Sequence, residues 1–137
     1  MTITSTCPYP VWYQIVPQKG GNLAWELLSP SYTFPWTTYP PLSPPDCDGV
    51  SIRLGTKNFD GLTPEPITQV EVAWDSFSSS VIYDVSDLNS YGPSPFYKQG
   101  YVLYANEAAT NTFPLCNTIH CGSGENPCRD VYWYGMH

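Results

Sequence analysis

Residues 67–86, ITQVEVAWDSFSSSVIYDVS, decide the fold because they predict two strands joined by a short polar turn. In each half, apolar side chains alternate with polar ones, and a period of two residues is that of a half-buried β-strand. A turn centred on Phe77 and Ser78 would bring the two halves together as an antiparallel hairpin. We therefore predict that residues 67–74 pair with residues 81–86.

The position of the turn sets the register of this hairpin. The pairs predicted on one face are Val70 with Val85, Val72 with Tyr83, and Trp74 with Val81. That face is apolar and should pack on the core, while Glu71 lies directly opposite Asp84 on the other face. A slip of one residue would put charges among the apolar side chains, so the pattern specifies this register.

The facing acids need a physical reason. Directly opposed Cβ atoms in antiparallel strands lie about 4.5–5.5 Å apart, and like charges there are destabilising. Arg53, on the outward side of the strand predicted at 49–56, is placed to reduce the repulsion. The pair could form a solvated acidic face, bind a cation or meet the hydroxyl groups of a sugar.

The rest of the chain predicts further short strands rather than helices. Fifteen prolines and ten glycines leave few stretches without a helix breaker. Residues 10–16 and 99–105 are predicted strands, and residues 22–28 form either a strand or a single helical turn. Residues 29–48 hold six prolines and are predicted to be an ordered loop or edge segments. The predicted class is all-β, as an antiparallel sandwich or barrel.

Length and charge limit the possible functions. At 137 residues the chain is long enough for one domain, residues 1–137, with a core of its own. The net charge of −7 repels phosphate backbones, so we expect no nucleic-acid partner. No apolar run is long enough to span a bilayer, so we expect no membrane partner, and we expect a monomer.

Five cysteines, combined with few charges, are typical of an oxidising compartment. They are Cys7, Cys47, Cys116, Cys121 and Cys128. Because five is odd, at most two disulfides form within the chain. The first ten residues, MTITSTCPYP, have no signal-peptide pattern, and we interpret Met1 as standing in place of a removed signal peptide. The expected location is extracellular.

Five segments, in this order, resemble the thaumatin-like proteins, particularly their small, cysteine-poor fungal relatives. One of them, residues 67–74, ITQVEVAW, resembles the segment that supplies an acidic glutamate. Residues 4–17, TSTCPYPVWYQIVP, are similar to the first strand of that family, and residues 51–61, SIRLGTKNFDG, to its arginine-bearing strand. Residues 82–96, IYDVSDLNSYGPSPF, resemble the most specific stretch of the family. Residues 115–134 resemble its cysteine-rich region. The resemblance runs along nearly the whole chain.

The resemblance implies an antiparallel β-sandwich without the extended second domain of the large members, for which this chain is too short. It also implies an acidic cleft that binds β-glucans and supports antifungal action. The cleft role passes to Glu71, Asp84 and, less directly, Arg53. Asn89 stands where the family often has a further aspartate, with Asp87 two residues earlier, and this lowers the negative charge of the cleft.

Aromatic side chains add candidates for contact with sugar rings. Trp36, Tyr39 and Tyr91 are placed to stack on a sugar, with packing in the core as the alternative for each. The complete set of ligand-binding candidates from the strand and loop region is Arg53, Glu71, Asp84, Asp87, Asn89 and Tyr91.

The C-terminal region leaves its chemistry open. The resemblance allows Cys7 to pair with a tail cysteine, and two of Cys116, Cys121 and Cys128 to close a small loop. With His120, these three also offer zinc ligands, but the spacing matches no standard zinc motif, so we expect disulfides and no metal or other cofactor. The roles of His120 as a general base and of Asp130 as a cleft acid stay undecided.

These features predict a secreted, non-catalytic protein that binds cell-wall polysaccharide, with a defence, antifungal or effector role. One alternative is a secreted effector that binds a partner protein through the acidic face. The other is a weak β-glucanase, because Glu71 and Asp84 could meet the separation of about 5–5.5 Å that retaining glycosidases need.

Overall fold

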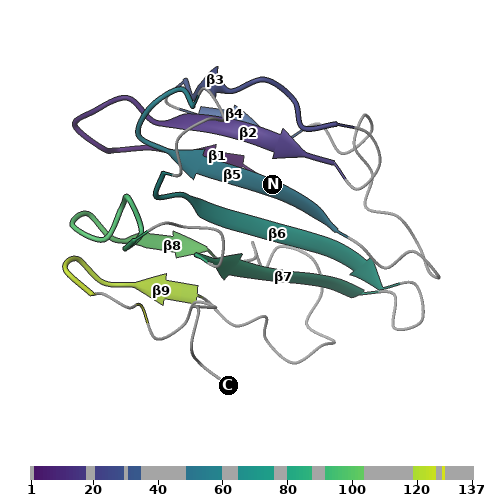
Figure 1. Ribbon diagram of the computed structural model, residues 1–137. Helices are drawn as coiled ribbons and strands as arrows, with labels where there is room; N and C mark the ends of the chain where they lie inside the picture. The colour runs from purple at the N-terminus through teal and green to yellow at the C-terminus, as the bar shows by residue number, and fades with distance from the viewer. Residues whose placement is uncertain are drawn as a thin grey trace.

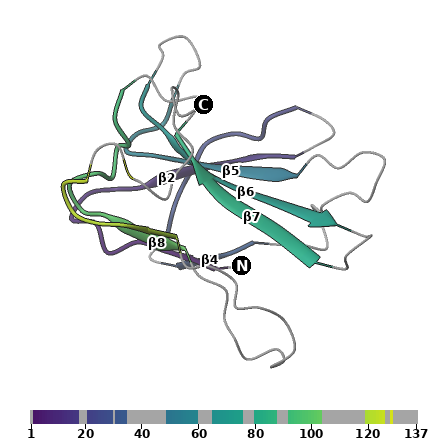
Figure 2. The same cartoon turned by 90° about the horizontal axis from the view of Figure 1, so that it is seen from below.

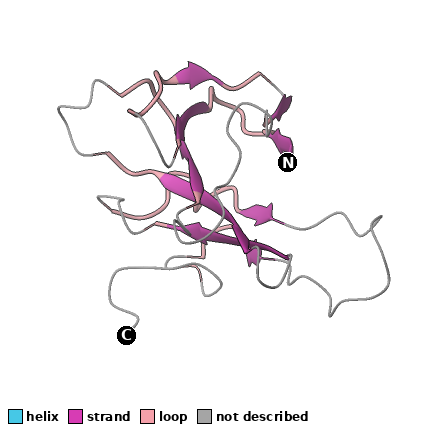
Figure 3. Ribbon diagram, turned by 90° about the vertical axis from the view of Figure 1, so that its right-hand side faces the viewer, coloured by secondary structure: helices cyan, strands magenta, loops and turns pink. Residues whose placement is uncertain are grey.

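The computed structural model describes residues 2–17, 21–29, 31–34, 49–59, 65–75, 80–87, 92–103, 119–125 and 128. In these residues the protein is all-β, with antiparallel strands and no helix (Figure 1, Figure 3). The described part accordingly contains no helix with the length and hydrophobicity of a membrane span. The predicted class, all-β and antiparallel, is confirmed.

A five-stranded antiparallel sheet is the centre of the fold, with the strand order β3-β2-β5-β6-β7. Its members are β2 (Trp12–Val16), β3 (Glu26–Leu27), β5 (Val50–Gly55), β6 (Thr68–Asp75) and β7 (Ser80–Ser86). Each falls within or next to a segment predicted as a strand. Of the two possibilities for residues 22–28, the strand is the one observed.

Two small sheets accompany the large one. They are β1 (Thr2–Thr4) with β4 (Ser31–Thr33), and β8 (Tyr101–Leu103) with β9 (Ile119–Cys121). Seen from below, both lie on the same side of the five-stranded sheet (Figure 2). The strands β1 and β9 were not predicted, because residues 1–10 were interpreted as a chain start and residues 115–134 as a cysteine-rich region.

The hairpin register predicted from the sequence is confirmed. β6 pairs with β7 so that Val70 lies opposite Val85, and Glu71 opposite Asp84. On the apolar side Val70, Val72 and Val85 are buried, with exposed fractions of 8%, 5% and 1%. This burial is the reason for the register, because shifting the pairing by one residue would expose all three side chains.

The core lies between the apolar face of the five-stranded sheet and the two small sheets. Ile52, at the centre of β5, is 1% exposed and packs with Val50, Tyr13 and Ile15. Tyr32 of β4 covers this cluster, and its ring lies 4.4 Å from that of Tyr13. Burying each such aliphatic side chain contributes about 1.5–3 kcal/mol.

A second, smaller cluster fills the space under β8 and β9. Val85 of β7 packs there with Cys121 and Cys128, both buried, and Tyr101, Leu103 and Ile119 surround them. The small sheets thus cover the apolar face near β2 and near β7, while the opposite face of the large sheet carries the polar side chains.

Candidate functional site

The face of the five-stranded sheet that points away from the two small sheets carries two adjacent rows of mainly polar side chains, which we call the polar face. The register places one row across four strands: Gln14, Arg53, Gln69 and Ser86. The next row consists of Val16, Ser51, Glu71 and Asp84. Arg53, Glu71 and Asp84, which were predicted to act together, therefore share one face.

A ladder of hydrogen bonds holds Arg53 in the first row. Its Nε donates to Gln69 Oε1 at 3.0 Å, and its Nη1 donates to Gln14 Oε1 at 3.4 Å. Gln14 Nε2 in turn donates to the carbonyl oxygen of Leu23 at 2.8 Å, and Ser51 Oγ donates to Gln69 Oε1 at 3.4 Å. The two glutamines therefore orient the guanidinium group beside the acids.

Sequence reasoning did not identify Gln14 and Gln69 as part of the site. Both are almost fully buried, with exposed fractions of 9% and 2%. The signal that could have found them is the alternation itself, because both stand at outward positions of predicted strands beside Arg53. They were not identified because uncharged amides between apolar residues do not by themselves indicate a binding site.

The acid pair is held in a partly desolvated place. Burial raises the pKa of Glu71, and the carboxylate of Asp84 raises it further, while Arg53 and a hydrogen bond with Ser86 lower it. Burial also raises the pKa of Asp84. For Arg53, burial lowers the pKa and the charge of Glu71 opposes that change. Asp84 Oδ1 is buried and has no hydrogen-bond partner among the described residues.

A pocket of about 460 Å³ opens beside these acids. Its lining residues come from four neighbouring strands of the sheet and the segments that flank them: Val16, Pro17, Gly49, Val50, Ser51, Glu71, Val72, Ala73, Tyr83 and Asp84. The volume falls within the range of small-molecule sites, roughly 300–1,000 Å³. The lining therefore combines two acidic residues and two hydroxyl-bearing residues, Ser51 and Tyr83, with apolar residues.

Asp87 does not lie in the pocket with Glu71 and Asp84. It follows β7 and is 6% exposed, and its Oδ1 accepts a hydrogen bond of 2.8 Å from Thr68 Oγ1. Thr68 Oγ1 also lies 2.7 Å from Ser94 Oγ. Burial raises the pKa of Asp87 to about 6, although the bond from Thr68 acts in the opposite direction. The structure therefore does not bring Asp87 to the polar face with Glu71 and Asp84.

Several predicted site residues lie outside the described residues. They are Trp36, Tyr39, Asn89, Tyr91 and Asp130, together with Cys47 and Cys116. His120 is described, on β9, where its side chain is exposed and belongs to a different sheet from the one that carries the polar face.

The expectation of disulfides is not met by the described cysteines. Cys7, Cys121 and Cys128 are free thiols, so neither a bond from Cys7 to one of the other two nor a bond between Cys121 and Cys128 is present. Cys7 is half-buried against the main core, and the other two are buried under the small sheet of β8 and β9. The described cysteines thus give no support to the predicted oxidising compartment.

Comparisons of the chain with protein-family models, curated protein sequences and solved structures found no match. The resemblance to thaumatin-like proteins consequently stays a prediction from degenerate motifs. Any function must be argued from the polar face and its pocket.

Proposed function

We propose that the protein is a secreted, non-catalytic binding protein that recognises a neutral, hydroxyl-rich ligand of the cell-wall β-glucan kind at the polar face. The observation that carries this proposal is the pair of facing carboxyl groups, Glu71 and Asp84, in the wall of a ligand-sized pocket. The expected β-sandwich of the thaumatin-like type is part of the same proposal.

The charges of the site favour a neutral donor of hydrogen bonds. Two carboxylates accept hydrogen bonds and cannot donate them when ionised. The protein carries a net charge of −7, which disfavours anionic ligands. Arg53 lies close enough to Glu71 to offset part of the negative charge, and this weakens the attraction for a divalent cation. Sugar hydroxyl groups meet both requirements, because they are neutral and donate hydrogen bonds.

The unpartnered oxygen of Asp84 supports the same ligand chemistry. A buried oxygen without a hydrogen bond costs free energy, roughly 1–3 kcal/mol. A ligand hydroxyl group that donates to the Asp84 carboxylate would offset this cost. The apolar parts of the lining, such as Val16, Pro17 and Ala73, offer contact for the C–H surfaces of a sugar ring.

The site fits binding better than hydrolysis. Glycoside cleavage needs one carboxyl group as an acid and another as a base, so their environments must push the two pKa values apart. Here burial is the main influence on both Glu71 and Asp84, and it raises both pKa values. Burial alone therefore does not separate an acid from a base. A weak β-glucanase is the second candidate, and the same experiment tests it.

A sedimentation assay on insoluble β-1,3-glucan tests the proposal. We expect the wild type to be retained and Glu71→Gln/Asp84→Asn to stay in the supernatant. The matched control is Glu26→Gln/Glu65→Gln, which changes the net charge equally but alters carboxyl groups that contact Tyr13 and Lys57 instead of the pocket. Retention of the control and the wild type but not of the pocket variant is the expected pattern.

Two other results would redirect the assignment. Equal retention of the wild type and the pocket variant would contradict a role for this face. If no polysaccharide retains the wild type, the alternative of a secreted effector that binds a partner protein is favoured. If the wild type releases reducing sugar and the pocket variant does not, the protein is a β-glucanase.

A further inference from the structure

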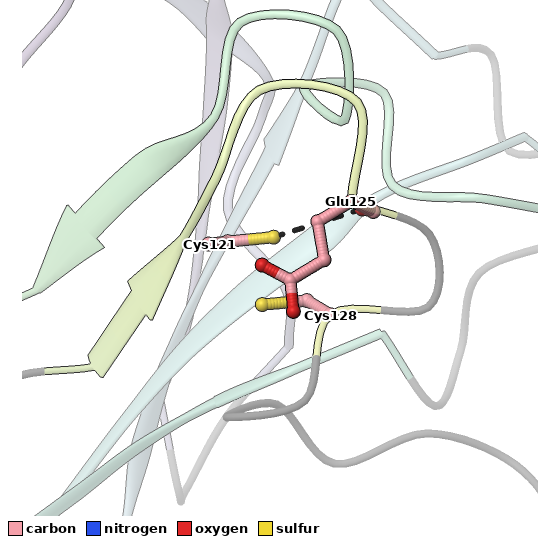
Figure 4. A group of neighbouring side chains, drawn as sticks. All are labelled: Cys121, Glu125 and Cys128. Atoms are coloured by element: carbon pink, nitrogen blue, oxygen red, sulfur yellow. Dashed lines mark hydrogen bonds between the residues drawn. The ribbon is translucent and has the colours of Figure 1, made fainter.

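A second group of side chains with strong ligand chemistry lies at the end of β9, on the other side of the five-stranded sheet from the polar face. Cys121 is the last residue of β9, Glu125 lies in the turn after it, and Cys128 follows. The two sulfur atoms and a carboxylate oxygen of Glu125 all lie within 4.8 Å of one another. Figure 4 shows the three side chains pointing toward a common centre.

The backbone of the turn produces this convergence. Glu125 N–H donates to the Gly122 carbonyl at 3.1 Å, and Gly122 N–H donates to Glu125 Oε2 at 3.0 Å. Gly124 has a φ of 81°, a conformation that L side chains rarely adopt, and its N–H donates to the Tyr97 carbonyl at 2.6 Å. The chain therefore folds back so that the Glu125 carboxylate faces Cys121.

The surroundings of the three groups exclude water from the sulfur atoms. Cys121 is 1% exposed and Cys128 is 5% exposed. Among the described residues, Cys121 Sγ donates a long hydrogen bond to the Glu125 carbonyl at 3.9 Å, and Cys128 Sγ donates one to the His120 carbonyl at 3.7 Å. The Glu125 carboxylate accepts a hydrogen bond from Gly122 N–H within the turn, and in this position it lies beside the two buried thiols.

A divalent cation that prefers sulfur and oxygen would use all three groups. Zinc is bound tetrahedrally by thiolates at about 2.3 Å and by carboxylates at about 2.0–2.2 Å, so its ligand atoms lie roughly 3.5–3.8 Å apart. Closing the present group to that spacing requires shifts of about 1 Å, which side-chain rotation provides. A disulfide between Cys121 and Cys128 would use only two of the three groups, whereas a cation uses all three.

The hydroxyl oxygen of Tyr101 is a candidate for the fourth ligand position. Tyr101 of β8 lies opposite Cys121 of β9, so the two side chains share a face of the small sheet. Its hydroxyl oxygen is buried and makes no hydrogen bond of good geometry with any described residue.

We propose that Cys121, Glu125 and Cys128 form a binding site for a zinc-type divalent cation, with the fourth position taken by water or by Tyr101. The two thiols lose their protons on binding, so affinity rises with pH. The site is separate from the polar face, and it stands or falls independently of the proposed carbohydrate binding. The sequence favoured disulfides here because the spacing of the cysteines and His120 matches no standard zinc motif, and Glu125 was not among the candidate ligands.

Titration of the reduced, chelator-treated full-length protein with cobalt(II) tests the site. We expect one cobalt ion per chain, with a thiolate-to-cobalt charge-transfer band and the intense visible bands of tetrahedral cobalt, and displacement of cobalt by zinc. Glu125→Gln should weaken binding about tenfold or more. Cys121→Ser/Cys128→Ser should abolish the charge-transfer band, whereas Cys7→Ser, which alters a free thiol elsewhere, should leave it unchanged.

Alkylation of the thiols gives a second readout that does not depend on the folding of the double variant. Because Cys121 and Cys128 are buried, alkylation is followed in mild denaturant, which lets the fold open transiently. Under these conditions zinc should protect both thiols of the wild type while Cys7 keeps its reactivity. The proposal is overturned if the folded, reduced wild type shows no thiolate-to-cobalt band. It is also overturned if the band persists without Cys121 and Cys128, or if zinc protects neither thiol.

Discussion

The two faces of the five-stranded sheet come from the same strands but have opposite character. On one face, Ile52, Val70 and Val85 are at most 8% exposed and lie under the small sheets. On the other, Arg53, Glu71 and Asp84 are half-buried, and burial shifts the pKa of each against its charged form. We infer that the apolar face supplies the stability and that the polar face is maintained at a cost, as binding sites often are.

The largest effect should come from the centre of the apolar face. Ile52→Ala removes a 1%-exposed side chain and leaves a cavity, so the free energy of unfolding should fall by about 2–5 kcal/mol. Ser51→Ala, one residue earlier on the polar face, should change it by less than about 1 kcal/mol. Urea denaturation of both variants measures this contrast. Equal losses of free energy of unfolding would contradict the different roles of the two faces.

Asp87 is a buried acid on the apolar side, so it can be compared with the half-buried acids of the polar face. Its folded pKa of about 6 lies above the unfolded value near 3.9, so its stabilising contribution is complete below about pH 4 and is lost as the pH rises through 6. Asp87→Asn keeps the acceptor for Thr68 and should raise the free energy of unfolding at pH 7 by about 1–3 kcal/mol. Denaturation at pH 4 and pH 7 measures this, and a loss of stability at pH 7 would contradict it.

Arg53 tests whether the polar face depends on charge compensation. Arg53→Gln removes the cation that lowers the pKa of Glu71, so that pKa should rise further and stability at pH 7 should fall by about 1 kcal/mol. Arg53→Lys is the control that keeps the charge but loses the two-pronged contact with Gln14 and Gln69. Carboxyl NMR titration follows Glu71. An unchanged Glu71 pKa in Arg53→Gln would show that the guanidinium does not act on the acids.

The smallest effect concerns the stability of the acid pair itself. Because burial raises both pKa values, the stabilising contribution of these carboxyl groups is present below about pH 4 and is lost at neutral pH. Glu71→Gln/Asp84→Asn should therefore be slightly more stable than the wild type at pH 7, by less than about 1 kcal/mol, and not at low pH. Thermal unfolding at both pH values provides the test. A marked loss of stability of the double variant at pH 7 would mean that the two acids stabilise the fold.

The sequence predicted the hairpin register correctly because the position of the turn set the pairing, and a slip of one residue would expose Val70, Val72 and Val85. The same alternation could have placed Asp87, since it follows Ser86 and so falls on the side of Val85. Asp87 was instead named as a ligand-binding candidate because it lies near Asn89, the position where the thaumatin-like family often has an aspartate. The resemblance to a family also favoured an acidic loop over a buried acid.

The chemistry at the end of β9 was beyond the sequence pattern. Residues 119–121 are too short for a clear alternation, and Glu125 joins two cysteines only through the turn at Gly122 and Gly124. Similarly, the link from Gln14 to Gln69 through Arg53 spans three strands, and only the sheet order reveals it. Contacts that depend on tertiary pairing carry no local signal.

Titration of isotopically labelled protein with a soluble β-1,3-glucan oligosaccharide, followed by amide NMR shifts, tests the central claim most directly. The account predicts shifts concentrated at the pocket strands, around Ser51, Glu71 and Asp84, with β8 and β9 unaffected, and no shifts in Glu71→Gln/Asp84→Asn. Shifts confined to other surfaces, or the same shifts in the variant, would contradict a ligand site on the polar face.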